Sequence, residues 1–164
     1  MTDETSEYYD EPVDVKGAQE VFKRNQPPRG NYTSIVEEYE PTITPTKYDG
    51  DDRQFYTVFL RGVLRTKDGE HVEQGLRFKL SAETRAKRDR DGNEIPGKDD
   101  IASRLWAEAV AAYVAVQGDE GEPLKTKGQL FEFIKTTPLV YNTMNGDGGN
   151  LIVLNISAPR KQRR

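Results

Sequence analysis

The chain has 164 residues, with 24 lysines and arginines against 28 aspartates and glutamates for a net charge of −4, and it contains no cysteine. This length fits one domain with tails. The absence of cysteine excludes disulfides, thiol catalysis and cysteine-ligated zinc, and it fits a reducing compartment. No stretch approaches the ~18 consecutive apolar residues of a membrane span, and the acidic N-terminus is unlike a secretory signal. We therefore expect no membrane partner and a protein that stays inside the cell that makes it.

The net charge is concentrated near the N-terminus. Residues 1–26 hold seven acids against three bases, which accounts for the whole charge of −4 and leaves the rest of the chain neutral. Residues 1–28 also lack sustained hydrophobic periodicity and end in two prolines, so they are predicted to form an acidic, flexible tail. A single domain is predicted over residues 29–158. Residues 159–164, with the sequence PRKQRR, are predicted to form a basic tail.

The first half of the domain has the patterns of strands. Residues 31–40 alternate apolar and polar side chains and predict a strand, whereas residues 41–53 contain two prolines and an Asp-Gly step and predict a loop. A long strand follows over residues 54–66. Asp68-Gly69 is typical of a tight hairpin turn, after which residues 71–80 pair back on the long strand.

A polar excursion and a helix come next. Residues 82–98 are rich in charge and broken by glycine and proline, which predicts an exposed excursion. Asp99 or Asp100 can cap the helix, apolar side chains recur at helical spacing after it, and Gly118 marks its end. This is the only helix that the pattern predicts.

The last third of the chain returns to strands. Residues 129–144 have the pattern of one strand, bent or interrupted at Pro138, and residues 151–158 that of another. The order is thus three strands, one helix and two strands. This is the order of an OB fold, a five-stranded closed or partly open barrel with its helix between the third and fourth strands. We expect a mainly β fold of this kind, with a small β-sandwich or roll carrying one packed helix as the alternative.

The stretch FYTVFLRGVLR, residues 55–65, separates two kinds of side chain. Successive side chains of a strand point to opposite faces, so Tyr56, Val58 and Leu60 share an inward face. The other face mixes rings with cations, which is typical of a surface that stacks bases and neutralises phosphates. The alternative is a second core face or a subunit contact. Together with the outward cations of the next strand, the candidate nucleic-acid-binding residues are Phe55, Phe59, Arg61, Arg65, Arg77 and Lys79.

Further candidates for the nucleic-acid interface lie outside these two strands. The cations Arg85, Lys87 and Arg88 in the excursion can reach over the backbone of a bound strand, although a solvated loop whose acids cancel the charge has the same composition. Tyr141, in a late strand, can add a ring to the stacking face or pack in the core.

Patterns for catalysis and metal binding are missing from the sequence. His71 is the single histidine and has no triad arrangement around it, and no Gly-Lys-Ser/Thr phosphate loop follows a strand. The acids that begin at Asp89 fail the EF-hand spacing because Glu94 stands where that loop needs glycine. We therefore predict a protein that is not an enzyme and that needs no cofactor or metal.

The chain contains, in order, PPRGNYTSIVEEYE, FYTVFLRGVLR with HVEQGLRFKLS, a predicted helix and LVYNTMNGDGGNLIVLNIS. This layout resembles that of the small single-stranded-DNA-binding proteins that bacteriophages encode beside replication and recombination genes. The resemblance covers roughly residues 27–158 and rests on layout. It implies an OB fold that coats single strands during replication, recombination or repair in the cytoplasm of the bacterial host. Phage replication or recombination proteins are the expected partners of the acidic tail, and the sequence leaves open whether the chain forms a homo-oligomer. Bacterial-type relatives usually carry that tail at the C-terminus, whereas here it is N-terminal.

The expected function is therefore binding of single-stranded DNA with little sequence preference, by base stacking and phosphate neutralisation. Such binding weakens steeply with salt, because neutralised phosphates release counterions. The alternative is a virion structural or assembly protein whose β-body and tails dock on neighbouring subunits.

Overall fold

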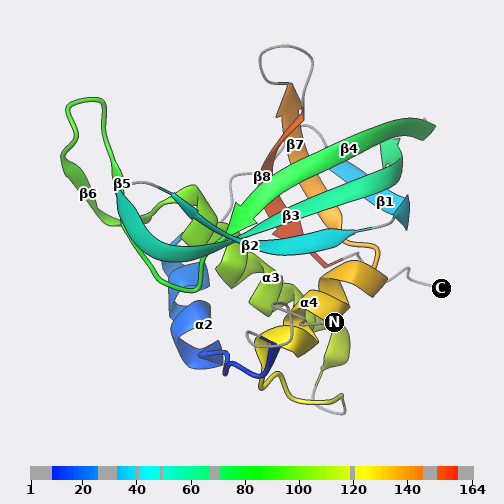
Figure 1. Ribbon diagram of the computed structural model, residues 1–164, viewed down its shortest axis with the longest axis horizontal. Coiled ribbons are helices and arrows are strands. Elements are labelled where there is room, and N and C mark those ends of the chain that lie inside the picture. The colour runs from blue at the N-terminus through cyan, green and yellow to red at the C-terminus, as the bar shows by residue number, and fades with distance from the viewer. Residues whose placement is uncertain are drawn as a thin grey trace.

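The computed structural model describes residues 9–25, 33–39, 41–48, 50–66, 71–118, 121–145 and 151–158. In chain order the elements are α2 (Val15–Arg24), β1 (Thr33–Tyr39), β2 (Thr42–Tyr48), β3 (Asp51–Thr66), β4 (His71–Leu80), β5 (Ala86–Arg88), β6 (Glu94–Asp99), α3 (Ile101–Gln117), α4 (Lys127–Thr136), β7 (Val140–Asn145) and β8 (Leu151–Ser157). A six-stranded sheet packs on α3 and α4, α2 lies on α3, and a two-stranded hairpin extends to one side (Figure 1). None of the helices in these ranges has the length and apolar character that crossing a bilayer requires.

Strand β3 organises the sheet, because it is long enough to pair with three neighbours. Its first part pairs with β2, its last part pairs with β1, and β4 pairs along the opposite edge. The β3–β4 ladder runs from Tyr56 opposite Leu80 to Arg65 opposite His71, which confirms the predicted hairpin. β1 also pairs with β7, and β7 with β8, so the order is β2-β3-β1-β7-β8 with β4 beside β3.

The sheet stays open between β4 and β8. Among the described residues these two strands share no ladder, although they lie close to each other, and α3 packs against both. The structure is therefore a mixed fold of antiparallel strands and helices, and the closed form of the predicted barrel is not present. The predicted placement of a helix between the β3–β4 hairpin and the last two strands is confirmed.

Helix α3 confirms the predicted helix at both ends. Asp100 is its N-cap, with the carboxylate accepting a backbone N–H at 3.1 Å, and Gly118 ends it with a φ of 62° in the left-handed region. Trp106 of this helix packs on Tyr56 of β3 with ring centroids 6.1 Å apart, and Phe131 of α4 packs on Tyr56 at 4.9 Å. These rings form the centre of the core between the sheet and the two helices.

Helix α4 lies where the sequence predicts a strand from residue 129, and that prediction is wrong. Thr126 and Gln129 form a capping box, in which the Thr126 hydroxyl accepts the Gln129 backbone N–H and the Gln129 side chain accepts the Thr126 N–H at 2.9 Å. A short apolar run fits a strand or a helix equally well by periodicity, and here the cap starts a helix. Its buried residues recur at helical spacing: Leu130, Phe131, Phe133 and Ile134.

Helix α2 lies within the acidic segment 1–28, so the prediction of a flexible tail is wrong for residues 15–24. Asp14 caps the helix by accepting a backbone N–H at 3.0 Å, and Ala18 and Val21 are buried where α2 meets α3. The helix is amphipathic but short, and this tertiary contact stabilises it, because a helix of 10 residues is marginal alone. Residues 1–8, 26–28 and 159–164 of the predicted tails lie outside the described residues.

The C-terminal end of α2 is tied to the end of β6. Arg24 donates to both carboxylate oxygens of Asp99, at 2.6 and 2.9 Å. Asn25 donates to the same carboxylate at 2.6 Å and accepts the Asp99 backbone N–H at 3.0 Å. The Arg24 hydrogen bond holds the pKa of Asp99 below its ordinary value against the effect of burial. A buried carboxylate with this many donors fixes the position of α2.

The segment before α2 crosses the start of α4. The Glu11 carbonyl accepts the Lys127 backbone N–H at 2.8 Å, and the Glu11 carboxylate binds Lys127 Nζ at 2.6 Å. Tyr9 packs on Phe131 with ring centroids 6.1 Å apart. A side chain at Gly128 would meet the Tyr9 carbonyl oxygen at 2.9 Å, so glycine is needed where the segment passes. This part of the acidic segment is therefore held by the body of its own chain.

Strand β2 lies within residues 41–53, where the sequence predicts a loop, and that prediction is wrong for residues 42–48. Ile43 stands opposite Val58 of β3 and is 4% exposed, so the segment contributes to the core. Pro45 is compatible with a strand here because β2 pairs with β3 and with no other described strand, and proline is tolerated on such an edge.

Strands β5 and β6 form an exposed hairpin, which confirms the predicted excursion over residues 82–98 and appears at the left of Figure 1. The Asp89 carboxylate accepts the backbone N–H groups of Asp91 and Asn93, both at 2.9 Å. These bonds close the turn, so the carboxylate supports the backbone of the hairpin.

Candidate nucleic-acid interface

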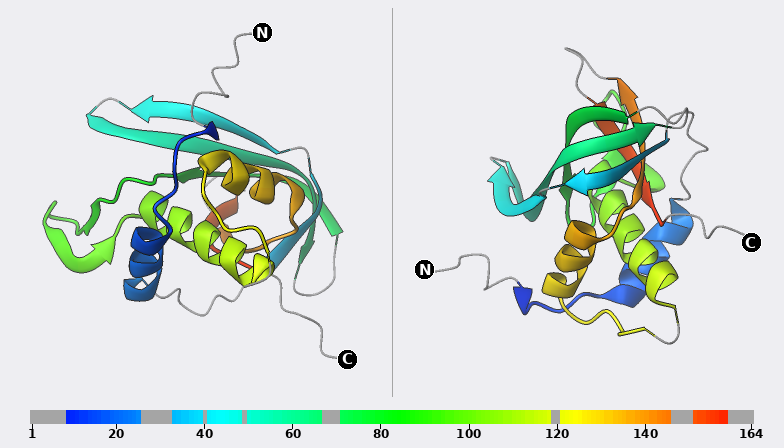
Figure 2. Two further views of the ribbon diagram at one scale, coloured as in Figure 1. Left: turned by 90° about the horizontal axis from the view of Figure 1, so that it is seen from below. Right: turned by 90° about the vertical axis from the view of Figure 1, so that its right-hand side faces the viewer.

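The side of the sheet that faces away from the helices carries most of the predicted stacking residues. Tyr56, Val58 and Leu60 are buried toward α3 and α4, so the residues that alternate with them point the other way. Figure 2 (left) shows both helices on one side of β2 and β3. We call the opposite side the outer face. Its described side chains from β2, β3 and β4 are Thr42, Thr44, Thr46, Tyr48, Phe55, Thr57, Phe59, Arg77 and Lys79.

Tyr48 is the most exposed ring of the outer face, and the sequence prediction missed it. Its side chain is 37% exposed and meets the Phe55 ring edge to face at 5.1 Å. The Lys79 Nζ lies 4.1 Å from the centroid of the Tyr48 ring. Phe55 itself is buried, with the Arg53 guanidinium 4.7 Å from its ring. Phe55 therefore supports Tyr48 and offers no free ring of its own.

Phe59 lies at the other end of the outer face and is half-buried. Register places it between Thr42 of β2 and Arg77 of β4. Its ring rests on Gly75, where an added Cβ would lie 3.1 Å from two ring carbons. The exposed Arg77 guanidinium lies 5.6 Å from the ring centroid. The absence of a side chain at Gly75 thus creates the seat for this ring.

The remaining β-strand candidates are Arg61, Arg65 and Tyr141. Register places Arg61 opposite Gly75 and Arg65 opposite His71, in line with Phe59, while their side chains lie outside the described residues. Tyr141 is 1% exposed and packs on Phe78 at 5.7 Å, so its prediction as a stacking residue is wrong. The Tyr141 side chain lies on the side of β7 that faces the core.

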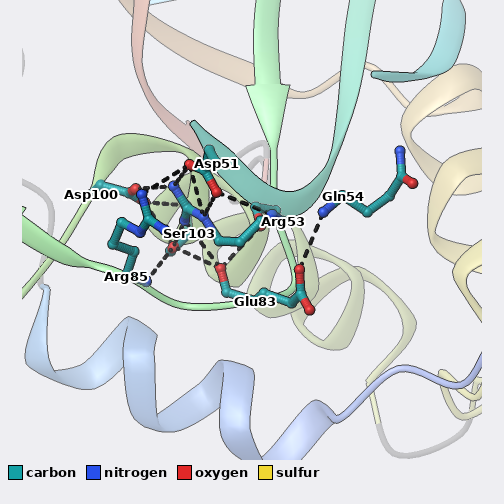
Figure 3. Close-up of polar contacts among 8 residues, drawn as sticks. Asp51, Arg53, Gln54, Glu83, Arg85, Asp100 and Ser103 are labelled. Atoms are coloured by element: carbon teal, nitrogen blue, oxygen red, sulfur yellow. Dashed lines mark hydrogen bonds and ion pairs between the residues drawn. The ribbon is translucent and has the colours of Figure 1, made fainter. Parts of the chain in front are cut away.

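A cluster of charges anchors the start of β3 to the start of α3 (Figure 3). Arg53 binds Asp51 at 2.9 Å and Asp100 at 2.6 Å, and it also donates to the Ser103 hydroxyl and to the Glu83 carbonyl. The hydrogen bond from Arg53 lowers the pKa of Asp51 to about 2. Because the Arg53 guanidinium is buried and its donors are used, this cation stabilises the fold and is not available to phosphates.

The predicted cations of the excursion, Arg85, Lys87 and Arg88, are exposed. Arg85 Nη1 is 3.3 Å from Asp51, so Arg85 belongs to the anchoring cluster. Lys87 and Arg88 lie on β5 and form no ion pair with a described residue. Asp51, which Arg85 contacts, stands opposite Tyr48 in the register of β2 and β3.

A buried carboxylate beneath β8 is a feature that the sequence prediction missed. Glu108 of α3 accepts the Ile156 backbone N–H at 2.8 Å and the Asn155 side-chain amide at 3.0 Å. Burial raises the pKa of Glu108 to about 7, although these hydrogen bonds and Arg104 act against the rise. Arg104 donates to the Leu154 carbonyl at 2.9 Å, next to the register shift between β7 and β8. The two side chains thus satisfy backbone groups of β8 on the open side of the sheet.

The outer face is the arrangement of described residues best suited to binding a ligand. Among the described residues, no three His, Cys, Asp or Glu side chains are grouped to hold a metal ion. No family model, no curated protein and no solved structure matches the chain. The chemistry of the outer face therefore carries the functional argument.

Proposed function

We propose that the protein binds single-stranded DNA with little sequence preference through the outer face. The observation that carries the proposal is two ring–cation contacts on the outer face, Tyr48 of β2 with Lys79 of β4 and Phe59 of β3 with Arg77 of β4. In each pair the ring offers a surface for a base and the exposed cation can neutralise a phosphate. Every base has a π-face, so stacking of this kind tolerates any sequence. The threonine hydroxyls between the two pairs add hydrogen-bonding groups.

The order of the strands supports an OB fold as part of the proposal. If β1 and β2 count as one bent first strand, the sheet has five strands, and α3 falls between the third and the fourth. OB folds are partly open Greek-key barrels that bind oligonucleotides on the face of their second and third strands. Here those strands are β3 and β4, which carry Phe59, Arg77 and Lys79. In this proposal α3 fills the gap between β4 and β8.

The proposed setting is replication, recombination or repair of phage DNA in the cytoplasm of a bacterial host, without a catalytic step. Replication or recombination proteins are the proposed partners of the acidic tail, together with further copies of the chain. The alternative of a virion assembly protein expects tails that dock on neighbouring subunits. The described part of the acidic tail instead packs on α3 and α4 of its own chain, so no specific observation favours that alternative.

A fluorescence-anisotropy titration tests the proposal with a labelled single strand and a duplex of the same sequence, at two salt concentrations. The single strand should bind more tightly, because stacking needs unpaired bases. Tyr48→Ala should weaken single-strand binding by about 1–3 kcal/mol, while Tyr48→Phe, which keeps the ring, should bind like the wild type. Equal binding of duplex and single strand, or unchanged binding by Tyr48→Ala, would refute the proposal.

A further inference from the structure

A second surface lies on the helix side of the molecule, away from the outer face. It is an open pocket of about 560 Å³ between the C-terminal half of α3, helix α4 and the segment around Tyr9. Its lining includes the rings of Tyr9, Tyr113 and Phe133, and the last two meet edge to face at 5.1 Å. Tyr113 and Phe133 are buried and form the floor. The contacts of the Tyr9 segment with α4 hold the Tyr9 ring in position without a ligand.

The rim of this pocket is acidic. Asp10, Glu122 and Glu132 line it and are exposed, and no lysine, arginine or histidine is among its lining residues. Within the part of the chain that the structure describes, none of the three carboxylates forms an ion pair. Lys135, whose Nζ donates to the Tyr9 hydroxyl at 2.8 Å and lies 5.6 Å from the centroid of the Tyr9 ring, is not among the lining residues. Exposed carboxylates of this kind suit guanidinium and ammonium groups, through charge-assisted hydrogen bonds.

We propose that this pocket is the docking site of the chain's own basic segment, residues 159–164. Four of the six residues in this segment, PRKQRR, are cations, and no acid lies among them. Its charge is therefore complementary to that of the rim. The segment follows β8, which ends at Ser157.

The reach of the segment is sufficient for docking within one chain. Ser157 at the end of β8 pairs with Val140, and Val140 is three residues beyond Thr137, which lines the pocket. Paired strands lie about 4.8 Å apart and an extended residue spans about 3.3 Å, so Ser157 lies within ~15 Å of Thr137. The seven residues that follow Ser157 span up to ~23 Å when extended. The cations can therefore arrive at the rim without a change in the fold.

Docking of this kind has a defined dependence on salt and does not rest on DNA binding. The carboxylates are exposed, so each ion pair contributes little and is screened when salt is raised. The tether compensates, because a segment attached this closely acts at an effective concentration on the order of millimolar. The docked state should therefore dominate at low salt and decline at high salt, whether or not the outer face binds DNA.

Carbodiimide cross-linking of the full-length protein tests the proposal at low salt. This reagent joins a lysine amine to a carboxylate in contact with it, and Lys161 is the single lysine of the segment. Peptide mass spectrometry should find Lys161 joined to Asp10, Glu122 or Glu132. An equal mixture of ¹⁵N-labelled and unlabelled protein should show these links within one isotopic chain. Links between the two isotopic forms, or links from Lys161 mainly to other carboxylates, would overturn docking within the chain.

Two matched double variants complete the cross-linking test. Glu122→Gln with Glu132→Gln should remove most links to Lys161, whereas Asp91→Asn with Glu94→Gln, which alters exposed acids of the β5–β6 hairpin, should not.

A peptide titration provides the second readout. The variant is the full-length protein with all four cations of the segment changed to glutamine. It should bind a labelled APRKQRR peptide about threefold more tightly than the wild type, because the chain's own segment no longer occupies its pocket. Absence of cross-links together with equal peptide binding by the two proteins would also overturn the proposal.

Discussion

The two sides of the sheet use the same kinds of residue for different purposes. On the helix side, the Phe131 ring is fully buried and the Glu108 carboxylate is enclosed beneath β8. On the outer face, the Tyr48 ring remains 37% exposed and the Lys79 amine stands over it. An aromatic ring therefore stabilises the fold where another element covers it and is available to a ligand where none does. The comparison predicts that substitutions on the helix side change stability, whereas those on the outer face change binding.

The largest expected effect is the loss of a ring on the helix side. Phe131 is 0% exposed and contacts both Tyr56 and Trp106. Phe131→Ala should lower the free energy of unfolding by about 3–5 kcal/mol, because a large buried ring leaves a cavity. Urea denaturation measures this loss, with Tyr48→Ala on the outer face as the control that should cost far less. Similar losses for the two variants would contradict the division between the sides.

The next effect concerns the buried charge on the helix side. The pKa of Glu108 is about 7 in the folded protein, above its ordinary value of 4.5, so the folded state binds the proton more tightly than the unfolded state. The stability from this group is therefore complete below about pH 4.5 and is lost as the pH rises through about 7. At about 1.4 kcal/mol for each pKa unit, the loss is on the order of 3 kcal/mol.

Urea denaturation of the wild type and of Glu108→Gln at pH values from about 4 to about 8 checks this prediction. This pH range covers roughly the whole titration of the carboxyl group. The glutamine keeps the shape of the side chain and has no proton to lose. It should flatten the profile over this range and make the protein more stable than the wild type at the alkaline end. An unchanged profile would mean that Glu108 keeps an ordinary pKa.

On the outer face, loss of a ring should weaken binding more than folding. Phe59→Ala should reduce single-strand affinity by about 1–3 kcal/mol and leave the salt dependence nearly unchanged, because a ring contributes stacking and releases no counterion. Phe59→Tyr, which keeps a ring over Gly75, is the matched control. The melting temperature is measured alongside. A stability loss as large as that of Phe131→Ala would place Phe59 in the core and favour the assembly alternative.

The smallest expected effect is on the salt dependence of binding. Lys79→Gln should reduce the slope of log Kobs against log salt concentration by about 0.7, the value for one phosphate contact on a single strand. Lys79→Arg keeps the charge and should keep the slope. Titrations at several salt concentrations measure both variants. A wild-type slope in Lys79→Gln would show that this cation does not contact a phosphate.

Local patterns in the sequence were sufficient to predict the β3–β4 hairpin and helix α3. The alternation in FYTVFLRGVLR assigns Tyr56, Val58 and Leu60 to the core side, as observed. The Asp68-Gly69 step in the sequence predicts the hairpin, and the cap at Asp100 and the stop at Gly118 set α3. The reason is that these signals act over a few residues and depend on backbone geometry. Phe59, Arg77 and Lys79 could be assigned to one face for the same reason.

Tertiary structure decided the features that depend on distant neighbours. β2 is a strand because β3 pairs with it, and α2 is a helix because α3 covers its apolar side. Tyr141 is buried because its strand turns it toward Phe78. The capping box of α4 was readable in the sequence, but its apolar run alone does not distinguish helix from strand. The exposure of Tyr48 and the enclosure of Glu108 follow from which element covers each position, and that covering comes from contacts far apart in the chain.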